Sequence, residues 1–328
     1  FATVHMVPED PLADDVATWL TAELTSKEFQ GNSRDLENLA WAFATMLILN
    51  RQLMSTISHC TQTHSSDFST LQGCANLAWA YATLAVRDIP LLHFLTEQSC
   101  ALLGCTEQGQ RHGTQSLANL VWSFATLEFK EPSWWRVMAD QTTSSAAALK
   151  VQETASIAWA FTTVLFNDGP LVEALVRVAI IQMNEFSPQQ LANIAWAFCA
   201  LEHTELEIYC QITGAACQWL SSSERGEMSD QALAALLWSL PRFADGAYAL
   251  ALLQTANENS VAVALESLGP LLCEYEALAD GEDCMQEQGL VFRLEQGLDK
   301  VAVRTAVGFR MAVVGKIQDH SASQDDAV

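Results

Sequence analysis

One short segment brings together side chains that bind zinc in other proteins. His59, Cys60 and His64 lie within two helical turns, and Cys74 follows ten residues later. Imidazoles and thiolates are common zinc ligands, but a closed structural site needs four ligands arranged as a tetrahedron. This segment supplies neighbouring ligands without a matching second pair. We therefore predict that these side chains pack as ordinary residues and that the chain holds no metal.

Other reactive patterns are incomplete. Gly308, Gly315 and Lys316 resemble part of a phosphate-binding loop, but six residues rather than four separate the glycines. Ile317 also stands where that loop needs Ser or Thr to hold Mg²⁺. No nucleophile, base and orienting acid can be assembled from the sequence. We expect a protein that is not an enzyme, with no cofactor and no small-molecule substrate.

Polar residues recur at fixed distances from six tryptophans, Trp41, Trp79, Trp122, Trp159, Trp196 and Trp238. Positions in each repeat are counted here from its tryptophan, which is position 0. Position −7 is Arg34, Gln72, Gln115, Gln152, Gln189 and Gln231. Position −3 is Asn38, Asn76, Asn119, Ser156, Asn193 and Ala235. Position +1 is small: Ala42, Ala80, Ser123, Ala160, Ala197 and Ser239. These positions are four residues apart and share one helix face.

Two interpretations of these polar positions are open from the sequence. Along the inner helices of a solenoid, amides can read the edges of unpaired bases, about one base per repeat. Alternatively, the glutamines satisfy free N–H groups at the helix start, the asparagines bond across repeats, and the small residues let helices approach. In the first case positions −7 and −3 bind RNA or another partner, and in the second they are structural.

The repeat itself predicts the fold. The tryptophans are 38, 43, 37, 37 and 42 residues apart, within copies of an Asn-Leu-Ala-Trp-Ala-Phe motif. In the fifth copy, Leu191, Ile194, Ala195, Phe198 and Leu201 lie on one face of a helix. Trp196 belongs to a second apolar stripe, so we expect the six tryptophans to form the structural core. Replacing Trp159 by Ala should then cost about 3–5 kcal/mol.

Each motif is expected to pair with a preceding amphipathic helix. In the fifth copy Ser187, Pro188 and Gln190 form a helix start with a capping box, and Thr70 and Ser229 occupy the same cap position. The predicted partner helices cover 11–28, 91–103, 134–149, 171–186 and 206–220. The two longer spacings arise from loops at 105–113 and 221–229.

Together these signals predict an all-α, right-handed α-solenoid of about six helix-turn-helix repeats of 37–43 residues. The array should cover 1–245, followed by a helical capping region at 246–320 and a disordered tail at 321–328. The sequence contains no stretch of 18 apolar residues without a charge, so it predicts no membrane span. The chain begins at Phe1, which we interpret as the result of a removed targeting peptide or as the start of a fragment.

The charge balance bears on the partners. Sixteen Lys and Arg oppose 39 Asp and Glu, a net charge of −23. Between residues 151 and 241 the cations are Arg177 and Arg225, against ten acids. Such a charge repels polyanions at long range and suits a basic protein partner. The nine cysteines are scattered singly, so we expect reduced thiols rather than a disulfide framework.

A family resemblance arises from the same residues. Leu191 to Phe198, reading Leu-Ala-Asn-Ile-Ala-Trp-Ala-Phe after Ser-Pro-Gln-Gln, resembles the octotricopeptide-type repeat and its relatives in RAP-domain proteins of algal and protist organelles. The resemblance covers about two thirds of the chain, although no RAP-type C-terminal domain is visible. It implies an α-solenoid in a chloroplast or mitochondrion that binds organellar RNA through positions −7 and −3. The alternative is an acidic scaffold subunit that binds protein within a larger organellar assembly.

Overall fold

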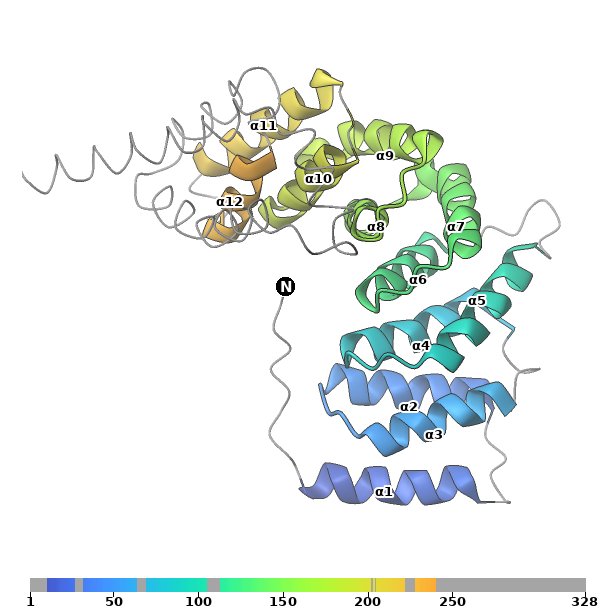
Figure 1. Cartoon of the computed structure of the whole chain (residues 1–328). Helices are drawn as coiled ribbons and strands as arrows, with labels where there is room; N and C mark the ends of the chain where they lie inside the picture. Colours follow the sequence, from blue (N-terminus) through green and yellow to red (C-terminus); the bar gives the residue numbers. More distant parts are fainter. Residues whose placement is uncertain are drawn as a thin grey trace, which may run out of the picture. The chain divides into compact units, whose positions relative to one another are not determined.

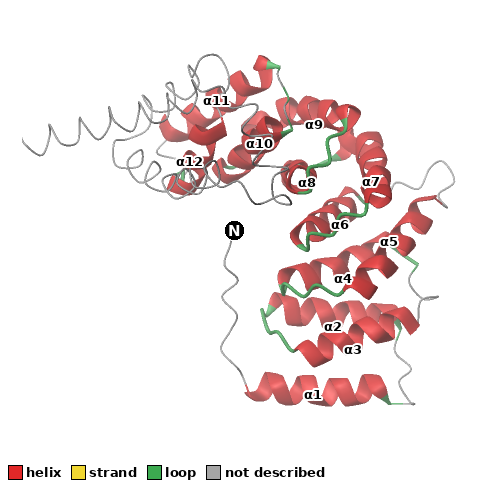
Figure 2. Ribbon diagram, in the orientation of Figure 1, coloured by secondary structure: helices red, strands yellow, loops and turns green. Residues whose placement is uncertain are grey.

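The computed structural model describes residues 11–26, 32–63, 69–104, 113–201, 203, 205–221 and 228–239. Within these residues every regular element is a helix and no strand occurs (Figure 2). This confirms the predicted all-α class. The capping region at 246–320 and the tail at 321–328 lie outside the described residues, as do most of the two predicted loops.

None of the helices within the described ranges combines the length and the apolar character that crossing a membrane requires.

The chain divides into two compact units, residues 1–175 and 176–328. The first unit contains α1 (Pro11–Thr25), α2 (Ser33–Thr45), α3 (Arg51–Thr63), α4 (Leu71–Thr83), α5 (Ile89–Gly104), α6 (Thr114–Thr126), α7 (Pro132–Ser145), a 3₁₀ turn (Ala146–Ala148) and α8 (Val151–Thr163). Helix α9 (Gly169–Gln182) begins in the first unit and ends in the second. The second also contains a 3₁₀ turn (Met183–Glu185), α10 (Pro188–Ala200), α11 (Leu206–Ser221) and α12 (Asp230–Ser239).

Motif and partner helices alternate as the repeat predicts. The motif helices, which contain the repeated tryptophans, are α2, α4, α6, α8, α10 and α12, and the partner helices are α1, α3, α5, α7, α9 and α11. In the first unit each motif helix contacts the next, from α2 to α8, and the partner helices α1, α3, α5 and α7 contact one another in the same order (Figure 1). In the second unit α10 contacts both α11 and α12. These contacts are compatible with stacked helix pairs.

Three faces of the motif helices α4, α6, α8 and α10 are buried, and α2 buries two of them. Successive residues rotate by about 100°, so positions −5 and +2, positions −4, −1 and +3, and positions −2, +1 and +5 define separate faces. The −5/+2 face holds the large residues: Leu36 and Phe43, Cys74 and Tyr81, Leu117 and Phe124, Thr154 and Phe161, Leu191 and Phe198. The −4/−1/+3 face is mostly alanine, for example Ala75, Ala78 and Ala82 in α4. Only the face opposite −5/+2 is left for solvent.

Helix α2 shows which face meets which neighbour. Its −2/+1/+5 face is incompletely covered, since Met46 at position +5 is 49% exposed. The equivalent residues of α4, α6 and α8, which follow another motif helix, are buried: Leu77, Ala80 and Leu84; Leu120, Ser123 and Leu127; Ile157, Ala160 and Val164. In addition, Glu37 at position −4 of α2 lies against Gly73 at position −6 of α4. The alanine-rich face of one motif helix therefore packs on the −6/−2/+1/+5 face of the next.

Helix α7 supplies the largest core side chains of the first unit. Trp134 and Trp135 are each 1% exposed. The Trp134 ring stacks on Phe124 with 4.1 Å between centroids, and its indole N–H donates to Ser99 Oγ at 2.9 Å. Trp135 donates to the carbonyl of Phe129 and meets Phe161 edge to face, with 5.1 Å between centroids. Tryptophans of a partner helix thus fill the core beneath the motif helices.

Both helix types begin at capping residues that recur with the repeat. Motif helices are capped at position −9, where Asn32, Thr70 and Ser187 accept from backbone N–H groups of the first turn. Partner helices are capped at position +9, where Asp88 and Asp168 accept from N–H groups of Leu91 and Leu171, both at 3.0 Å. An anionic cap also suits the positive end of the helix dipole.

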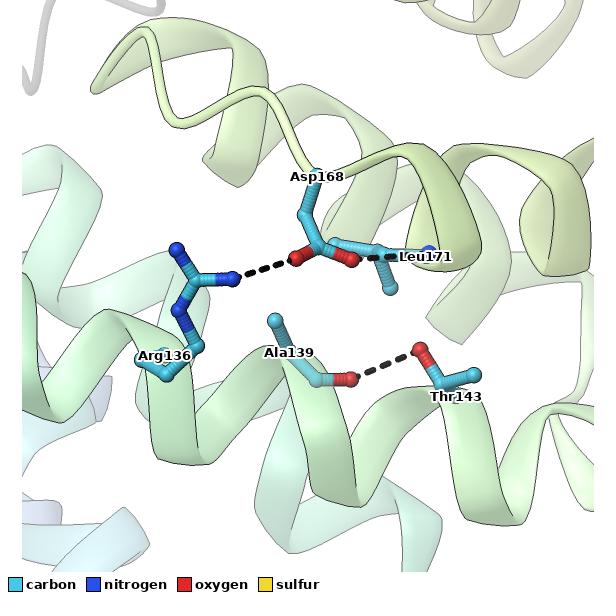
Figure 3. Close-up of polar contacts among 5 residues, drawn as sticks. All are labelled: Arg136, Ala139, Thr143, Asp168 and Leu171. Atoms are coloured by element: carbon cyan, nitrogen blue, oxygen red, sulfur yellow. Dashed lines mark hydrogen bonds and ion pairs between the residues drawn. The ribbon is translucent and has the colours of Figure 1, made fainter.

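Asp168 has a second partner. Its other carboxylate oxygen accepts from the Arg136 guanidinium of α7 at 2.8 Å, while its first oxygen holds the Leu171 N–H of α9 (Figure 3). The Arg136 guanidinium carbon also lies 5.3 Å from the ring centre of Phe166. The cap of one partner helix is therefore tied to the helix before it.

Motif helices end in the same left-handed turn. The residue at position +6 has positive φ in four repeats, at Leu47, Ala85, Glu128 and Leu165. The next residue donates back to the +2 carbonyl, as from Val86 to Tyr81 at 2.8 Å and from Phe129 to Phe124 at 2.9 Å. This is the Schellman arrangement, which usually places glycine at the left-handed residue because side chains with a Cβ are strained there.

Replacing Ala85 by Gly should therefore stabilise the protein. Relief of the left-handed strain, about 1–2 kcal/mol, exceeds the entropic cost of glycine, so we expect a gain of roughly 0.5–1 kcal/mol. The free energy of unfolding in urea measures it. Ala101→Gly, at an exposed site within α5, is the matched control and should lose roughly the same amount. A loss in both variants would contradict the strain argument.

The buried carboxyl of Glu37 predicts a pH effect. Burial raises the pKa of Glu37, and the charge of Arg34 offsets part of that rise. The folded state then holds the proton more tightly than the unfolded chain, so this contribution to stability is full below the ordinary pKa of 4.5. It is lost as pH rises through the folded-state pKa. The free energy of unfolding of Glu37→Gln, relative to wild type, should increase as the pH rises above 4.5. A difference that stays constant with pH would contradict the assignment.

Candidate binding surface

The face of the motif helices that remains exposed carries the predicted polar positions. At position −7, Arg34, Gln72, Gln115, Gln152 and Gln189 are all exposed. At position −3, Asn38 is exposed, and Asn76, Asn119, Ser156 and Asn193 are half-buried. The stripe continues through position 0 to position +4, where Thr45 and Thr126 are exposed. We call positions −7, −3, 0 and +4 the open stripe.

Two residues of the open stripe are directly linked in α10. The Gln189 side-chain amide donates to Asn193 Oδ1 at 3.2 Å, one helical turn away. The helix-start N–H groups in α2, α4 and α10 are satisfied by position −9, and in α2, α8 and α10 the position −6 side chain closes the capping box. The glutamine at position −7 is therefore not needed as a cap where position −9 already serves.

The small residue at position +1 is not on this surface. Ala80, Ser123 and Ala160 are completely buried between motif helices, Ala197 of α10 is also completely buried, and Ala42 of α2 is half-buried. The sequence grouped positions −7, −3 and +1 because four-residue steps advance slowly around a helix. After two steps the third residue has turned into the interface, so it serves helix packing.

The motif tryptophans correct the sequence prediction of a tryptophan core. Trp41 is 51% exposed, and Trp79, Trp122, Trp159 and Trp196 are half-buried. Position 0 lies opposite position +2, whose phenylalanine or tyrosine is the buried aromatic residue of the motif. An apolar residue in a largely apolar helix gives no sequence signal of this orientation. The asparagine at position −3, which precedes Trp41, Trp79, Trp122 and Trp196 by about one turn, was the signal that could have shown it.

Charged residues are almost absent from the motif helices. Helices α4, α6 and α10 contain none. Helix α8 contains Glu153, which is buried and accepts from the Lys150 N–H at 2.9 Å. Helix α2 differs, with exposed Arg34 and Asp35 and the buried Glu37. Most acids among the described residues of the first unit therefore lie on the partner helices and the connecting turns, as at Asp88 and Asp168.

Some predicted residues are not described. The side chains of Gln231 and Trp238 in α12, and residue His64 of the histidine and cysteine segment, lie outside the described residues. Within the described ranges no group of three potential metal-ligating side chains occurs. Cys60 and Cys74 are buried, and burial, reinforced by the charge of Glu37, raises the pKa of Cys74 to about 12. The Cys60 thiol donates a hydrogen bond to the Leu24 carbonyl, with 3.6 Å between sulfur and oxygen.

Comparison with known proteins does not assign the chain to a family. No family model matches it, and no curated protein matches it in sequence.

The two kinds of tryptophan should respond differently to truncation. Trp134→Ala removes a fully buried ring and its hydrogen bond to Ser99, and should cost about 3–5 kcal/mol. Trp159→Ala removes a half-buried ring and should cost about 1–2 kcal/mol, less than its sequence-based expectation. Unfolding in urea measures both. Equal losses would show that the motif tryptophans are core residues after all.

Proposed function

We propose that this chain is a non-enzymatic helical-repeat binding module, a right-handed α-solenoid that binds single-stranded RNA through the open stripe. The observation that carries the proposal is the pair of amide positions on the consecutive motif helices α4 and α6, exposed at position −7 and half-buried at position −3. An amide both donates and accepts hydrogen bonds, so it suits the edge of an unpaired base. The family resemblance supports an organellar setting and a role in RNA processing, stability or translation.

The local charge supports this ligand better than the total charge does. A chain with net charge −23 repels phosphates at a distance. At the open stripe of α4 and α6, however, the helices supply no acid that a phosphate would meet, and α2 adds the exposed cation Arg34 at position −7. Binding there depends on hydrogen bonds and on apolar contact, with little contribution from ion pairing.

The same charge supports a second candidate function. An acidic scaffold would attract a basic protein and guide its association at low salt. The observation behind this second function is that 39 acidic residues outnumber 16 Lys and Arg, although part of these residues lies outside the described ranges. In that function the open stripe would be one contact among several, and acids on the partner helices and turns would dominate binding.

The salt dependence of RNA binding tests the proposal. The affinity of the full chain for a fluorescein-labelled RNA strand without self-complementarity is measured by anisotropy across KCl concentrations. We expect binding at low salt with a slope of log K against log[KCl] shallower than about −3, because few phosphates meet cations. Absence of binding at low salt would exclude the RNA function. A steep slope would place binding on cations away from the open stripe.

Removal of the amides locates the surface. The double variant Asn76→Ala and Asn119→Ala should bind the same RNA about tenfold more weakly, since each lost hydrogen bond costs about 0.5–1.5 kcal/mol. Gln52→Ala and Gln211→Ala remove exposed amides from the partner helices α3 and α11, and should leave affinity unchanged. An equal loss of RNA affinity from the asparagine substitutions and from the glutamine substitutions would argue against the open stripe as the binding site.

A further inference from the structure

The motif tryptophans occupy an unusual place for so large an apolar ring. Position 0 is the centre of the open stripe, between the amide at position −3 and the threonine at position +4 of the same face. Trp41, Trp79, Trp122 and Trp159 all keep part of the indole in solvent. The core does not need them there, because Phe124, Phe161, Trp134 and Trp135 fill it. The ring is therefore repeated on the surface in each motif helix of the first unit.

Packing fixes these rings without covering them. Position 0 adjoins the −4/−1/+3 face, whose residues are all buried in α4, α6 and α8. Trp79, Trp122 and Trp159 are half-buried beside this face, whereas Trp41 of α2 is 51% exposed. A ring held on one side loses little conformational freedom when a ligand covers its other side.

We propose that Trp79, Trp122 and Trp159 stack against unpaired bases of an RNA strand, while the residue at position −3 of the same helix bonds to the base edge. The proposal rests on the RNA function above and specifies its ligand as single-stranded and unstacked. An indole offers a flat π-face that every base can match, and such stacking is a main source of affinity for single strands. The polar side chain three residues earlier, an amide before Trp79 and Trp122 and the hydroxyl of Ser156 before Trp159, lies on the same helix face and supplies the directional contact.

The distribution of charge favours an RNA base over a cationic peptide as the ligand of the exposed indoles. A cation over an indole face is also favourable, so a Lys-rich peptide is the competing occupant. The helices that hold Trp79 and Trp122 contain no acid to anchor such a cation, and their neighbouring stripe positions are Gln, Asn and Thr. Amides and aromatic rings without carboxylates favour a base over an ammonium group.

The test compares substitutions that keep or remove the aromatic face. Trp79→Leu with Trp122→Leu keeps apolar volume but removes both π-faces, and we expect its affinity for a labelled single-stranded RNA of about 12 nucleotides to fall at least tenfold. Trp79→Phe with Trp122→Phe keeps an aromatic face and should stay within about threefold of wild type. Trp19→Leu, which changes a 62% exposed tryptophan of α1 outside the open stripe, is the matched control and should bind as wild type does.

Each result bears on one of the two proposals. If wild type binds the single strand but the Leu pair binds equally well, stacking is wrong and the RNA function stands. Equal affinity for a duplex of the same sequence would also overturn stacking, because paired bases offer no free face. If wild type binds no RNA but binds polylysine, both proposals fail and the acidic scaffold is favoured. Circular dichroism shows whether the Leu pair is folded. If it is not, the quenching of indole fluorescence by RNA is compared between the Phe pair and wild type. Stacking predicts less quenching in the Phe pair, and equal quenching would overturn it.

Discussion

Contact between successive motif helices is the constraint on which the first unit depends. The −4/−1/+3 face is mostly alanine, and it meets a face that has a small residue at position +1 between two apolar residues. Small residues let the helix axes approach, so each contact buries apolar surface along the helix. With both sides taken by neighbours and the −5/+2 face turned to the partner helices, one face remains. The open stripe exists because the other three faces are occupied.

Local signals make this packing repeat in register. A cap at position −9 sets where each motif helix begins, a left-handed residue at position +6 ends it, and a cap at position +9 begins the next partner helix. Glycine is absent from position +6 in four repeats, where Leu47, Ala85, Glu128 and Leu165 accept the strained conformation. The strain of a few such residues is small beside the burial that the stacked helices achieve.

The sequence predicted the helices and their starts because both are local properties. Spacing of apolar residues and the Ser187–Gln190 capping box are visible without tertiary structure, and both were confirmed. The orientation of the motif tryptophans was mispredicted because nearly every side of these helices is apolar or small. In α6 the residues at positions −2, −1 and +2 are as apolar as Trp122. Which of them faces solvent depends on neighbours 37 to 43 residues away, which periodicity does not encode.

The polar positions show the same division between local and tertiary information. Positions −7 and −3 were identified as a shared face, and the structure leaves both accessible to different degrees. Position +1 was grouped with them by helical geometry, yet it lies in the contact between motif helices. Glu37 is a tertiary feature of another kind: its carboxyl fits only because Gly73 of the next helix has no side chain. The open stripe was therefore predictable in its amides and not in its tryptophans.

Total charge is a poor guide to the chemistry of this surface. Acids such as Asp88 and Asp168 cap partner helices, where the helix dipole stabilises them, so part of the negative charge has a structural cause. A charged side chain at positions −4, −1 or +3 would have to enter the contact between motif helices, and Glu37 shows the cost in its raised pKa. That excludes charge from the buried faces, whereas position −7 is exposed in both α4 and α6 and could hold Lys or Glu at little cost. Glutamine at this position in both helices is therefore not dictated by packing, and a ligand that contacts this face would account for it.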